Sequence, residues 1–411
     1  MMAKVKRLGI WLDGVCIADL EQTRFPGIRC RYSEEALRKW PLNSPVISCS
    51  LPLEERPLDA LAFCKGLLPE GQALQAMSAQ AQIPTNDTFE LLARFGRDVA
   101  GALILSEDEP SPANYGVERY SDNSLAGALF ELEEHPLGTH DDSELSLAGL
   151  EDKLVLVKLD DGGWGRPLHG LPSTHILKLD NRRFPGLVDA EASCLGLAKD
   201  LGLTTVDWQT ETLGSIVCLI VSRYDRERSD TGVTRIHQED LCQAMGINPA
   251  MAQGRGKYQR AGGPRLSDAA QLLDTYAEDP ERELGRLAAA MTFTVLIGNA
   301  DAHGKNLSLI HRNPTSVELA PLYDTVPTLL WSELRTQGAM TIGPMTELSA
   351  VRPRDLLSET GAWGLAESQA RAVVAGTLEQ TLDALDRGVI EKGSKLADEV
   401  RRRAEALAGD L

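Results

Sequence analysis

Residues 288–328 read AAAMTFTVLIGNADAHGKNLSLIHRNPTSVELAPLYDTVPT. The stretch opens with an apolar run that predicts a helix ending at Gly298, because glycine commonly terminates helices. The polar octet NADAHGKN follows, and the apolar runs on either side of HRNPTS predict a β-hairpin with its turn at Asn313-Pro314. Asp324 comes directly after the second strand. A helix, a polar loop, a hairpin and a carboxylate therefore follow one another in this order.

Asp301, Asn306 and Asp324 carry the hard oxygen atoms that magnesium binds. Phosphoryl transfer needs a carboxylate at the nucleophile and a cation that bridges the phosphates. In protein kinases the catalytic carboxylate lies five residues before a metal-binding Asn, and the hairpin that follows delivers a second carboxylate. The spacing here predicts Asp301 as the catalytic residue, with Asn306 and Asp324 as metal ligands. Taken singly, each could instead cap a turn or a helix.

Two further residues of the octet have open roles. His303 could orient the loop or contact phosphate, and Lys305 could neutralise phosphate or simply be solvated.

The segment from 145 to 225 is rich in predicted strands, interrupted by a helix at about 188–201. Lys178 shares a strand face with Ile176, so it could point into a cleft as a phosphate-binding lysine or protect an edge strand. Glu191, on the helix, could pair with Lys178 or be a solvated surface residue. The strand SIVCLIVSRYDRE, residues 215–227, could be a hinge whose backbone meets adenine, or only a buried strand.

The remaining sequence completes the predicted organisation. Strands at 4–20 and 99–105 with helical spacing at 57–95 predict a small α/β module, and the polar residues 107–143 predict a linker with little to pack. Helices are expected at 237–245, 268–276, 280–297, 346–351, 367–385 and 388–408. We expect an α+β, two-lobed protein-kinase-like fold with an additional N-terminal α/β module and a helical C-terminal lobe, divided at 1–110, 111–235 and 236–411.

Bulk composition limits the function. The 60 acidic against 42 basic residues give a formal net charge of −18, which argues against nucleic-acid binding by the general field of this chain but not against a basic partner. The seven cysteines form no C-x-x-C pair, so free thiols in a reducing compartment are expected. No apolar run approaches the ~20 residues of a membrane span, and the start reads as a strand rather than a signal peptide. These features predict a cytoplasmic protein.

In order along the chain, SLAG (146–149), HILKL (175–179), SRYDRE (222–227), NADAHGKN (299–306) and PLYD (321–324) resemble the HipA-like serine/threonine kinase toxins of bacterial type II toxin–antitoxin modules. The resemblance covers nearly the whole chain, and the family signature N-x-D-x-H-x-K-N is matched completely. It implies a kinase that uses ATP and Mg²⁺, with Asp301 as the catalytic base and Asn306 and Asp324 as the metal ligands. It also implies autophosphorylation at Ser146, where added negative charge beside the phosphates would oppose ATP binding. The implied ATP-binding residues are Ala148, Gly149, Leu150, Glu151, Asp152, Lys153, Lys178, Ser222, Arg223, Tyr224, His303, Gly304, Lys305 and Tyr323.

The phosphate-covering loop departs from the family pattern. Members usually have Gly-Ala-Gln-Glu-Lys after the serine, whereas this chain has Gly149-Leu150-Glu151-Asp152-Lys153. An acid in place of Gln puts the contacts of this loop with the triphosphate in doubt.

The resemblance also implies partners. Family members pair with a small HipB-like helix-turn-helix antitoxin, which binds operator DNA and recruits the toxin into a repressing complex. Known family targets include aminoacyl-tRNA synthetases, whose phosphorylation slows translation and favours dormancy and persistence. Two alternatives stay open: a catalytically weak, kinase-like corepressor, and a small-molecule or lipid kinase. The latter is disfavoured because no basic amphipathic membrane surface is evident.

Overall fold

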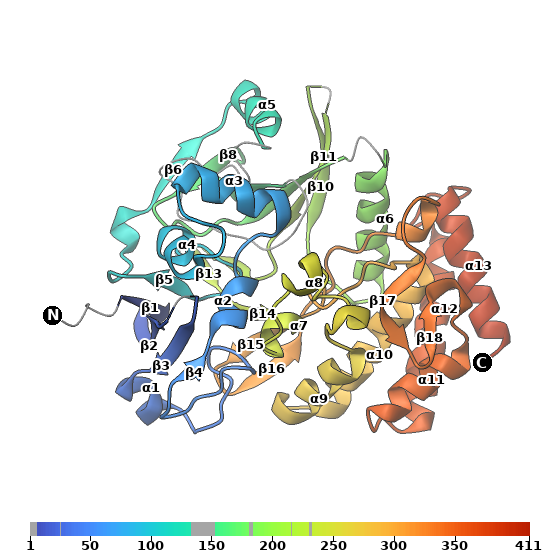
Figure 1. Ribbon diagram of the computed structural model, residues 1–411. Helices are drawn as coiled ribbons and strands as arrows, with labels where there is room; N and C mark the ends of the chain where they lie inside the picture. The colour runs from blue at the N-terminus through green and yellow to red at the C-terminus, as the bar shows by residue number, and fades with distance from the viewer. Residues whose placement is uncertain (1–5, 25, 133–152, 181–183, 215, 230–231) are drawn as a thin grey trace.

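The computed structural model describes residues 6–24, 26–132, 153–180, 184–214, 216–229 and 232–411. Strands dominate its first part and helices its second, as the sequence predicts. Figure 1 shows the N-terminal strands in blue on one side and the C-terminal helices in orange and red on the other. Within the described residues, no helix combines the length and the apolar character that a bilayer crossing demands.

The N-terminal sheet is antiparallel, with the strand order β4-β3-β2-β1-β5. The predicted strand at 4–20 is in fact a hairpin, because Asp13 and Gly14 both have positive φ, of 50° and 78°, as a two-residue hairpin turn requires. Helices lie between the strands of this sheet in sequence, with turns near Pro69 and Pro84 as predicted. The elements are β1 Arg7–Leu12, β2 Val15–Gln22, β3 Ile28–Tyr32, α1 Glu34–Lys39, β4 Leu58–Asp59, α2 Leu61–Gly66, α3 Gly71–Ala81, α4 Thr88–Phe95 and β5 Ile104–Ser106.

A second sheet has the order β10-β11-β9-β7-β8-β6. Its strands β9 and β11 pair in antiparallel register with Lys178 opposite Leu219, and α6 packs against β10 and β11. The strands β12 and β13 that follow form a separate two-stranded sheet. The elements of this part of the chain are η1 Pro112–Asn114, β6 Gly116–Arg119, α5 Asp122–Phe130, β7 Lys153–Lys158, β8 Trp164–Leu168, β9 His175–Leu179, α6 Leu187–Asp200, β10 Trp208–Leu213, β11 Ile216–Ser222, β12 Arg226–Ser229 and β13 Gly232–Arg235.

The prediction of an unpacked linker over 107–143 is wrong for its described part. Residues 116–119 form the edge strand β6, which pairs with β8. Ser121 then caps α5 through a capping box, and Leu125 and Leu129 are buried against the second sheet. Two leucines at helical spacing place one face of this helix against the sheet.

The second half is mainly helical. The long apolar helix α10 ends at Gly298, whose φ of 73° confirms the predicted terminator. The predicted hairpin is β15–β16, and β15 also pairs with β14. The elements are β14 His237–Asp240, α7 Leu241–Ala244, α8 Met251–Gly254, η2 Gln259–Ala261, α9 Leu266–Tyr276, α10 Pro280–Ile297, β15 Ser308–Asn313, β16 Ser316–Leu319, η3 Thr328–Leu330, β17 Gln337–Ile342, β18 Met345–Glu347, η4 Leu348–Ala350, α11 Pro353–Ala362, α12 Glu367–Arg387 and α13 Lys395–Gly409.

Three predicted helices differ from the structure. Residues 237–240 form the strand β14, because pairing with β15 satisfies their backbone, and only the Asp240-capped α7 is helical. Residues 345–347 form β18, followed by the short 3-10 turn η4. The last helix starts at Lys395 rather than 388, because Ser394 supplies its N-cap. In each case a tertiary pairing or a cap outweighs local propensity.

Candidate active site

A cavity of about 210 Å³ lies between the second sheet and the helical half. It brings together residues that the sequence analysis singled out from five separate segments. Of the sequence-predicted set, the cavity is lined by Lys153, Lys178, Ser222, Arg223, Tyr224, Asp301, His303, Lys305, Asn306, Tyr323 and Asp324. Gly304 is not among the lining residues.

Lys178 stands at the centre of an ion-paired cluster. Its ammonium lies 2.8 Å from the Glu191 carboxylate and forms a second ion pair with Asp324. Glu191 is buried on α6, and both Lys178 and Ile176 line the cavity. The structure therefore excludes both the edge-strand interpretation of Lys178 and the surface interpretation of Glu191.

Asp324 lies immediately after the hairpin region and turns the chain sharply. Its φ of 55° is in the left-handed region, which Asp tolerates better than most residues. Burial raises the pKa of the Asp324 carboxyl group, but the ion pair and hydrogen bond with Lys178 outweigh it, so the pKa lies below its ordinary value. Asp324 is therefore an anion at neutral pH.

Asn299 joins the catalytic loop to Asp324. Its side-chain oxygen accepts a hydrogen bond from the Asp301 backbone at 3.0 Å, and its amide donates to the Asp324 carbonyl at 3.2 Å. On the other side of the loop, the Asn306 amide donates to the Asp301 carbonyl at 3.2 Å. These bonds hold Asp301, Asn306 and Asp324 around one cavity, as the spacing of the sequence predicts.

The Asp301 carboxylate accepts a hydrogen bond from the Tyr258 hydroxyl at 2.7 Å. Protein atoms crowd this carboxyl group and raise the pKa of Asp301, against the lowering effects of Tyr258 and Lys257. The side chain nevertheless reaches solvent. An acceptor molecule can therefore approach Asp301 from outside.

His303 and Lys305 are both buried. A solvated surface role for Lys305 is therefore excluded. Burial and the nearby Lys257 lower the pKa of His303 to about 3, so the imidazole is neutral, and its Nδ1 accepts a hydrogen bond from the Lys305 backbone at 3.3 Å. The Lys305 ammonium is not solvated. It lies 3.1 Å from the Gly66 carbonyl, 3.3 Å from Asp240 and 3.5 Å from Glu70.

Ser222, Arg223 and Tyr224 form the edge of the cavity where the predicted hinge leaves β11. The backbone N–H groups of Ser222 and Arg223 already donate to the Asp207 and Thr174 carbonyls. The Tyr224 ring stacks on Tyr323 with centroids 5.3 Å apart. Tyr323 in turn donates to the Lys305 carbonyl at 2.7 Å, so an aromatic pair connects residues 222–224 to the 299–306 loop.

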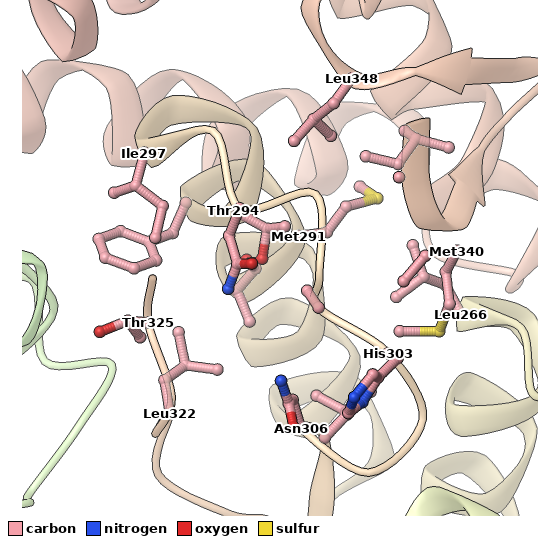
Figure 2. A pocket seen from close by; sticks show the side chains of 18 of the residues that line it. Leu266, Met291, Thr294, Ile297, His303, Asn306, Leu322, Thr325, Met340 and Leu348 are labelled. Atoms are coloured by element: carbon pink, nitrogen blue, oxygen red, sulfur yellow. The ribbon is translucent and has the colours of Figure 1, made fainter. Parts of the chain in front are cut away.

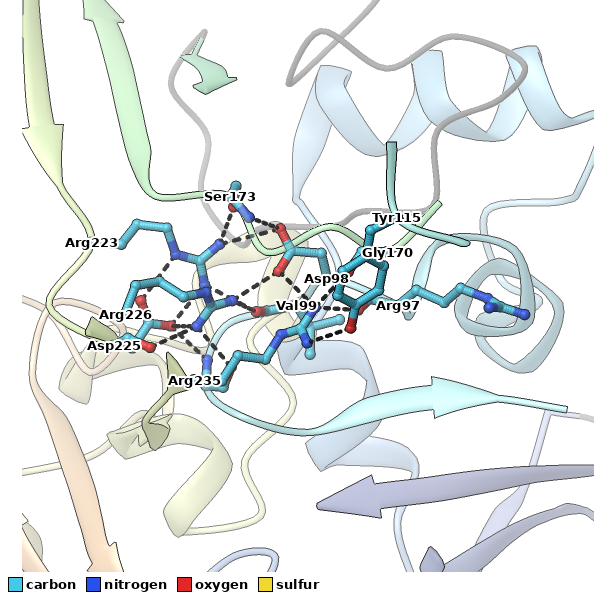
Figure 3. A network of polar contacts seen from close by, with 11 residues as sticks. Arg97, Asp98, Val99, Tyr115, Gly170, Ser173, Arg223, Asp225, Arg226 and Arg235 are labelled. Atoms are coloured by element: carbon cyan, nitrogen blue, oxygen red, sulfur yellow. Dashed lines mark hydrogen bonds and ion pairs between the residues drawn. The ribbon is translucent and has the colours of Figure 1, made fainter. Parts of the chain in front are cut away.

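The Arg223 side chain enters a buried network with the N-terminal module, where it donates to the Val99 carbonyl (Figure 3). It pairs with Asp225 at 2.7 Å, while Arg226 pairs with Asp98 at 2.9 Å. Arg235 lies 3.6 Å from Asp98 as well. Three arginines around two aspartates thus anchor the hinge, and the guanidinium of Arg223 serves this anchor.

A smaller cavity, about 50 Å³, lies behind the catalytic loop. Figure 2 shows His303 and Asn306 at one side of it and apolar side chains such as Leu266 and Met340 around the rest.

The donor set fits magnesium. Mg²⁺ is usually held by one or two carboxylates together with substrate phosphates and water, rather than by a full protein cage. Asp324 and Asn306 supply such a partial set. No cluster of three or more His, Cys, Asp or Glu residues suited to a metal occurs in the described ranges.

Sequence reasoning missed several residues of this site. Tyr258 lies in KYQRAGGP, where a tyrosine beside a tight Gly-Gly-Pro turn was the available signal. Glu70 and Asp98 contact the site from the N-terminal module, and no local pattern marks them. In the other direction, Ser146, Ala148, Gly149, Leu150, Glu151 and Asp152 lie outside the described residues.

Two lobes around one cavity, with a Lys–Glu pair on one side and an Asp–Asn loop on the other, define a kinase-like fold. Comparison with known proteins specifies it further. The model of the HipA N-terminal domain matches residues 8–106, and that of the HipA-like C-terminal domain matches residues 145–385. The chain belongs to the HipA family.

Individual relatives agree with this assignment. The chain is 34% identical to "Putative kinase Y4mE" of Sinorhizobium fredii over 98% of this chain and 97% of that protein. It is 27% identical to the serine/threonine-protein kinase toxin HipA of Shewanella oneidensis over 83% of this chain and 79% of that protein. The solved complex of HipA, HipB and operator DNA from Shewanella oneidensis MR-1 contains a chain with the same fold, with a TM-score of 0.80 at 22% identity, covering 98% of this chain and 96% of that one.

Proposed function

We propose that this chain is an ATP- and Mg²⁺-dependent serine/threonine protein kinase that acts as the toxin of a toxin–antitoxin pair. The observation that carries the proposal is the shared cavity, in which Lys178, paired with Glu191 and Asp324, lies across from the Asp301–Asn306 loop. Phosphoryl transfer relies on positioning and electrostatic stabilisation more than on covalent chemistry. This arrangement offers both.

Each residue has a defined task in this proposal. Asp301 accepts the proton of the acceptor hydroxyl, and Asn299 holds Asp301 in register with Asp324. Lys178 contacts phosphate oxygens and is kept in place by Glu191. Asp324 and Asn306 hold Mg²⁺, which when bound neutralises charge on the phosphates.

Adenine binding is assigned to the Tyr224 edge of the cavity. The backbone N–H groups of Ser222 and Arg223 already donate hydrogen bonds, whereas the backbone N–H group of Tyr224 has no hydrogen-bond partner among the described residues. Tyr224 is therefore the hinge residue whose backbone is available to a base. The remaining ATP contacts, including Lys153, Lys305 and the 148–152 loop, stay predictions.

Partners follow from the family. We infer a HipB-like antitoxin, operator DNA bound mainly through that antitoxin, and a cytoplasmic location. A translation-related protein is the proposed substrate, with an aminoacyl-tRNA synthetase as one candidate. The HipA–HipB–operator complex of the Shewanella relative supports the first two partners by analogy.

The test is incubation with labelled ATP and Mg²⁺, with phosphosites mapped by mass spectrometry. We expect autophosphorylation, at Ser146 in particular, that Asp301→Ala abolishes and that chelation of Mg²⁺ abolishes in the wild type. Ser146→Ala should lose that site while keeping transfer to other acceptors. Phosphate incorporation that persists in Asp301→Ala would overturn the assignment of the catalytic residue. Tight antitoxin binding without any phosphotransfer would favour a corepressor instead.

A further inference from the structure

Positive charge gathers in the part of the sequence that precedes α9 and α10. Residues 241–267 contain Arg255, Lys257, Arg260 and Arg265 but no Asp or Glu, in a chain with a formal net charge of −18. This basic stretch contrasts with the acidic composition of the whole chain. Its position in the fold determines which groups the positive charges can bind.

The stretch folds into a tight platform against the catalytic loop. A Cβ on Gly263 would lie 2.5 Å from the Gly256 carbonyl oxygen, so only glycine allows this close approach. The Lys257 carbonyl accepts a hydrogen bond from the Gly304 backbone at 3.1 Å. At the far side, Gln259 bonds Thr341 on β17 at 2.8 and 2.9 Å. The platform is thus fixed to both the catalytic loop and β17.

Tyr258 is the residue of the platform that contacts Asp301. Its hydroxyl donates to Asp301, and its ring packs edge-on against His303 with centroids 5.3 Å apart. Two guanidinium groups also pack over the ring, with the Arg335 Cζ 4.8 Å and the Arg260 Cζ 5.7 Å from its centroid. Such cation–π contacts hold both cations beside the catalytic carboxylate.

These two arginines differ from the buried lysine next to them. Lys257 is paired with Glu70 at 3.4 Å. Arg260 and Arg335 are exposed, and within the described part of the chain neither forms an ion pair with a carboxylate; Arg260 bonds only the neutral Gln337, at 2.9 Å. Arg335 is close enough to help lower the pKa of Asp301. Two cations without a carboxylate ion pair in the described residues therefore face solvent beside Asp301, where an acceptor must approach.

We propose that Arg260 and Arg335, held on the Tyr258 ring, bind an acidic side chain of the protein acceptor close to the hydroxyl that is phosphorylated. The inference rests on the proposed kinase function and names its substrate class. Guanidinium groups bind carboxylates through paired hydrogen bonds. The contacts through Tyr258 place Arg335 within about three extended residues of Asp301, so the selected acid lies within that distance of the acceptor Ser or Thr.

The test measures kcat/KM for synthetic peptides that each hold one Ser in a neutral frame. A single Glu, or a Gln in its place, is set at each of the three positions on either side. The wild type should favour Glu over Gln at one or more positions by about 10-fold, the range of a charge-assisted hydrogen bond. Arg260→Glu/Arg335→Glu should abolish or invert this ratio, whereas Arg260→Lys/Arg335→Lys should keep a preference for Glu but a smaller one, because an ammonium group cannot form the paired hydrogen bonds.

The Glu/Gln ratio within each variant corrects for any general loss of activity. A matched control, Arg38→Glu/Arg402→Glu, makes the same change in net charge at side chains 72% and 62% exposed on α1 and α13, and should keep the wild-type ratio. Equal rates for Glu and Gln peptides in the wild type, no transfer to the Glu peptides, or an unaltered ratio in the double Glu variant would each overturn the proposal. Mg²⁺-dependent ATP hydrolysis, with Asp301→Ala as the blank, tests the kinase function separately, so the two failures can be told apart.

Discussion

The Glu191 carboxylate lies 2.8 Å from the Lys178 ammonium, and it joins α6 to the middle strand β9 of the second sheet. Glu191 is only 1% exposed, so this is a buried pair rather than a surface contact. Removal of one partner from a buried pair leaves the other charge uncompensated, which costs more than a surface pair does. The position of the Lys178 ammonium therefore depends on the position of α6, which carries Glu191.

Glu191→Gln should therefore lower kcat/KM for ATP by about 10- to 100-fold, because Lys178 loses the charge-assisted bond that orients it. Steady-state kinetics with a fixed acceptor measure this. Glu367→Gln, whose side chain is 79% exposed on α12, is the matched control and should behave as the wild type. Kinetics of Glu191→Gln within twofold of the wild type would contradict the role of the pair.

Asp98→Asn should destabilise the anchor of the hinge. Asp98 is 1% exposed and faces Arg226, Arg223 and Arg235, so the neutral amide leaves these cations with Asp225 as the remaining anion of the network. We expect a loss of about 3–5 kcal/mol in the free energy of unfolding. The midpoint of urea unfolding measures this loss. Asp160→Asn, at a fully exposed carboxylate that pairs with the half-exposed Arg228, should change the midpoint little, and equal effects of the two variants would refute the anchor.

Gly101→Ala tests the close contact between the N-terminal module and β14. Gly101 has φ of +84°, and a Cβ there would lie 2.8 Å from the Gln238 carbonyl and 2.9 Å from His237. Gly162 has φ of +88° with no atom within 4 Å of such a Cβ, so Gly162→Ala reports backbone strain alone, about 1–2 kcal/mol. Gly101→Ala should cost about 1–3 kcal/mol more, from overpacking. Thermal or urea unfolding of both variants measures the difference, and similar losses would show that the contact is not tight.

Acid should loosen the same interface through His237. The imidazole donates to the Ile47 carbonyl at 2.8 Å when its Nε2 carries the proton. Burial, and then the neighbouring His311, lowers the pKa of His237 to about 3, against about 6.5 in an unfolded chain. The unfolded state therefore binds the proton first as the pH falls. The contribution of neutral His237 to the free energy of unfolding is fully present above pH ~6.5. Below that pH it falls by about 1.4 kcal/mol per pH unit.

Urea unfolding between pH 7.5 and pH 5 measures that slope. His237→Gln keeps a donor but cannot titrate, so its slope should be shallower than that of the wild type by about one proton. Parallel slopes for the two proteins would show that His237 is not the group responsible.

The catalytic segment could be predicted from the sequence because its parts are local. Asp301, Asn306 and the hairpin before Asp324 lie within 24 residues, and the helix terminator at Gly298 and the turn at Asn313-Pro314 follow from backbone chemistry that neighbouring residues dictate. The strand-rich half and the helix-rich half were predictable for the same reason. Hydrophobic period is a local property of the chain.

Only the tertiary structure decided which distant groups meet this segment. Lys178 had two equal interpretations until β9 and α6 placed it between Glu191 and Asp324. Residues 237–240 became a strand because β15 offers them backbone partners, and Lys305 was buried because Gly66, Glu70 and Asp240 surround it. Tyr258 and Arg260 lie beside Asp301 because of a glycine-dependent turn, and Arg335 reaches the same ring from the segment before β17. Contacts of this kind depend on through-space distance and burial, which sequence spacing does not encode.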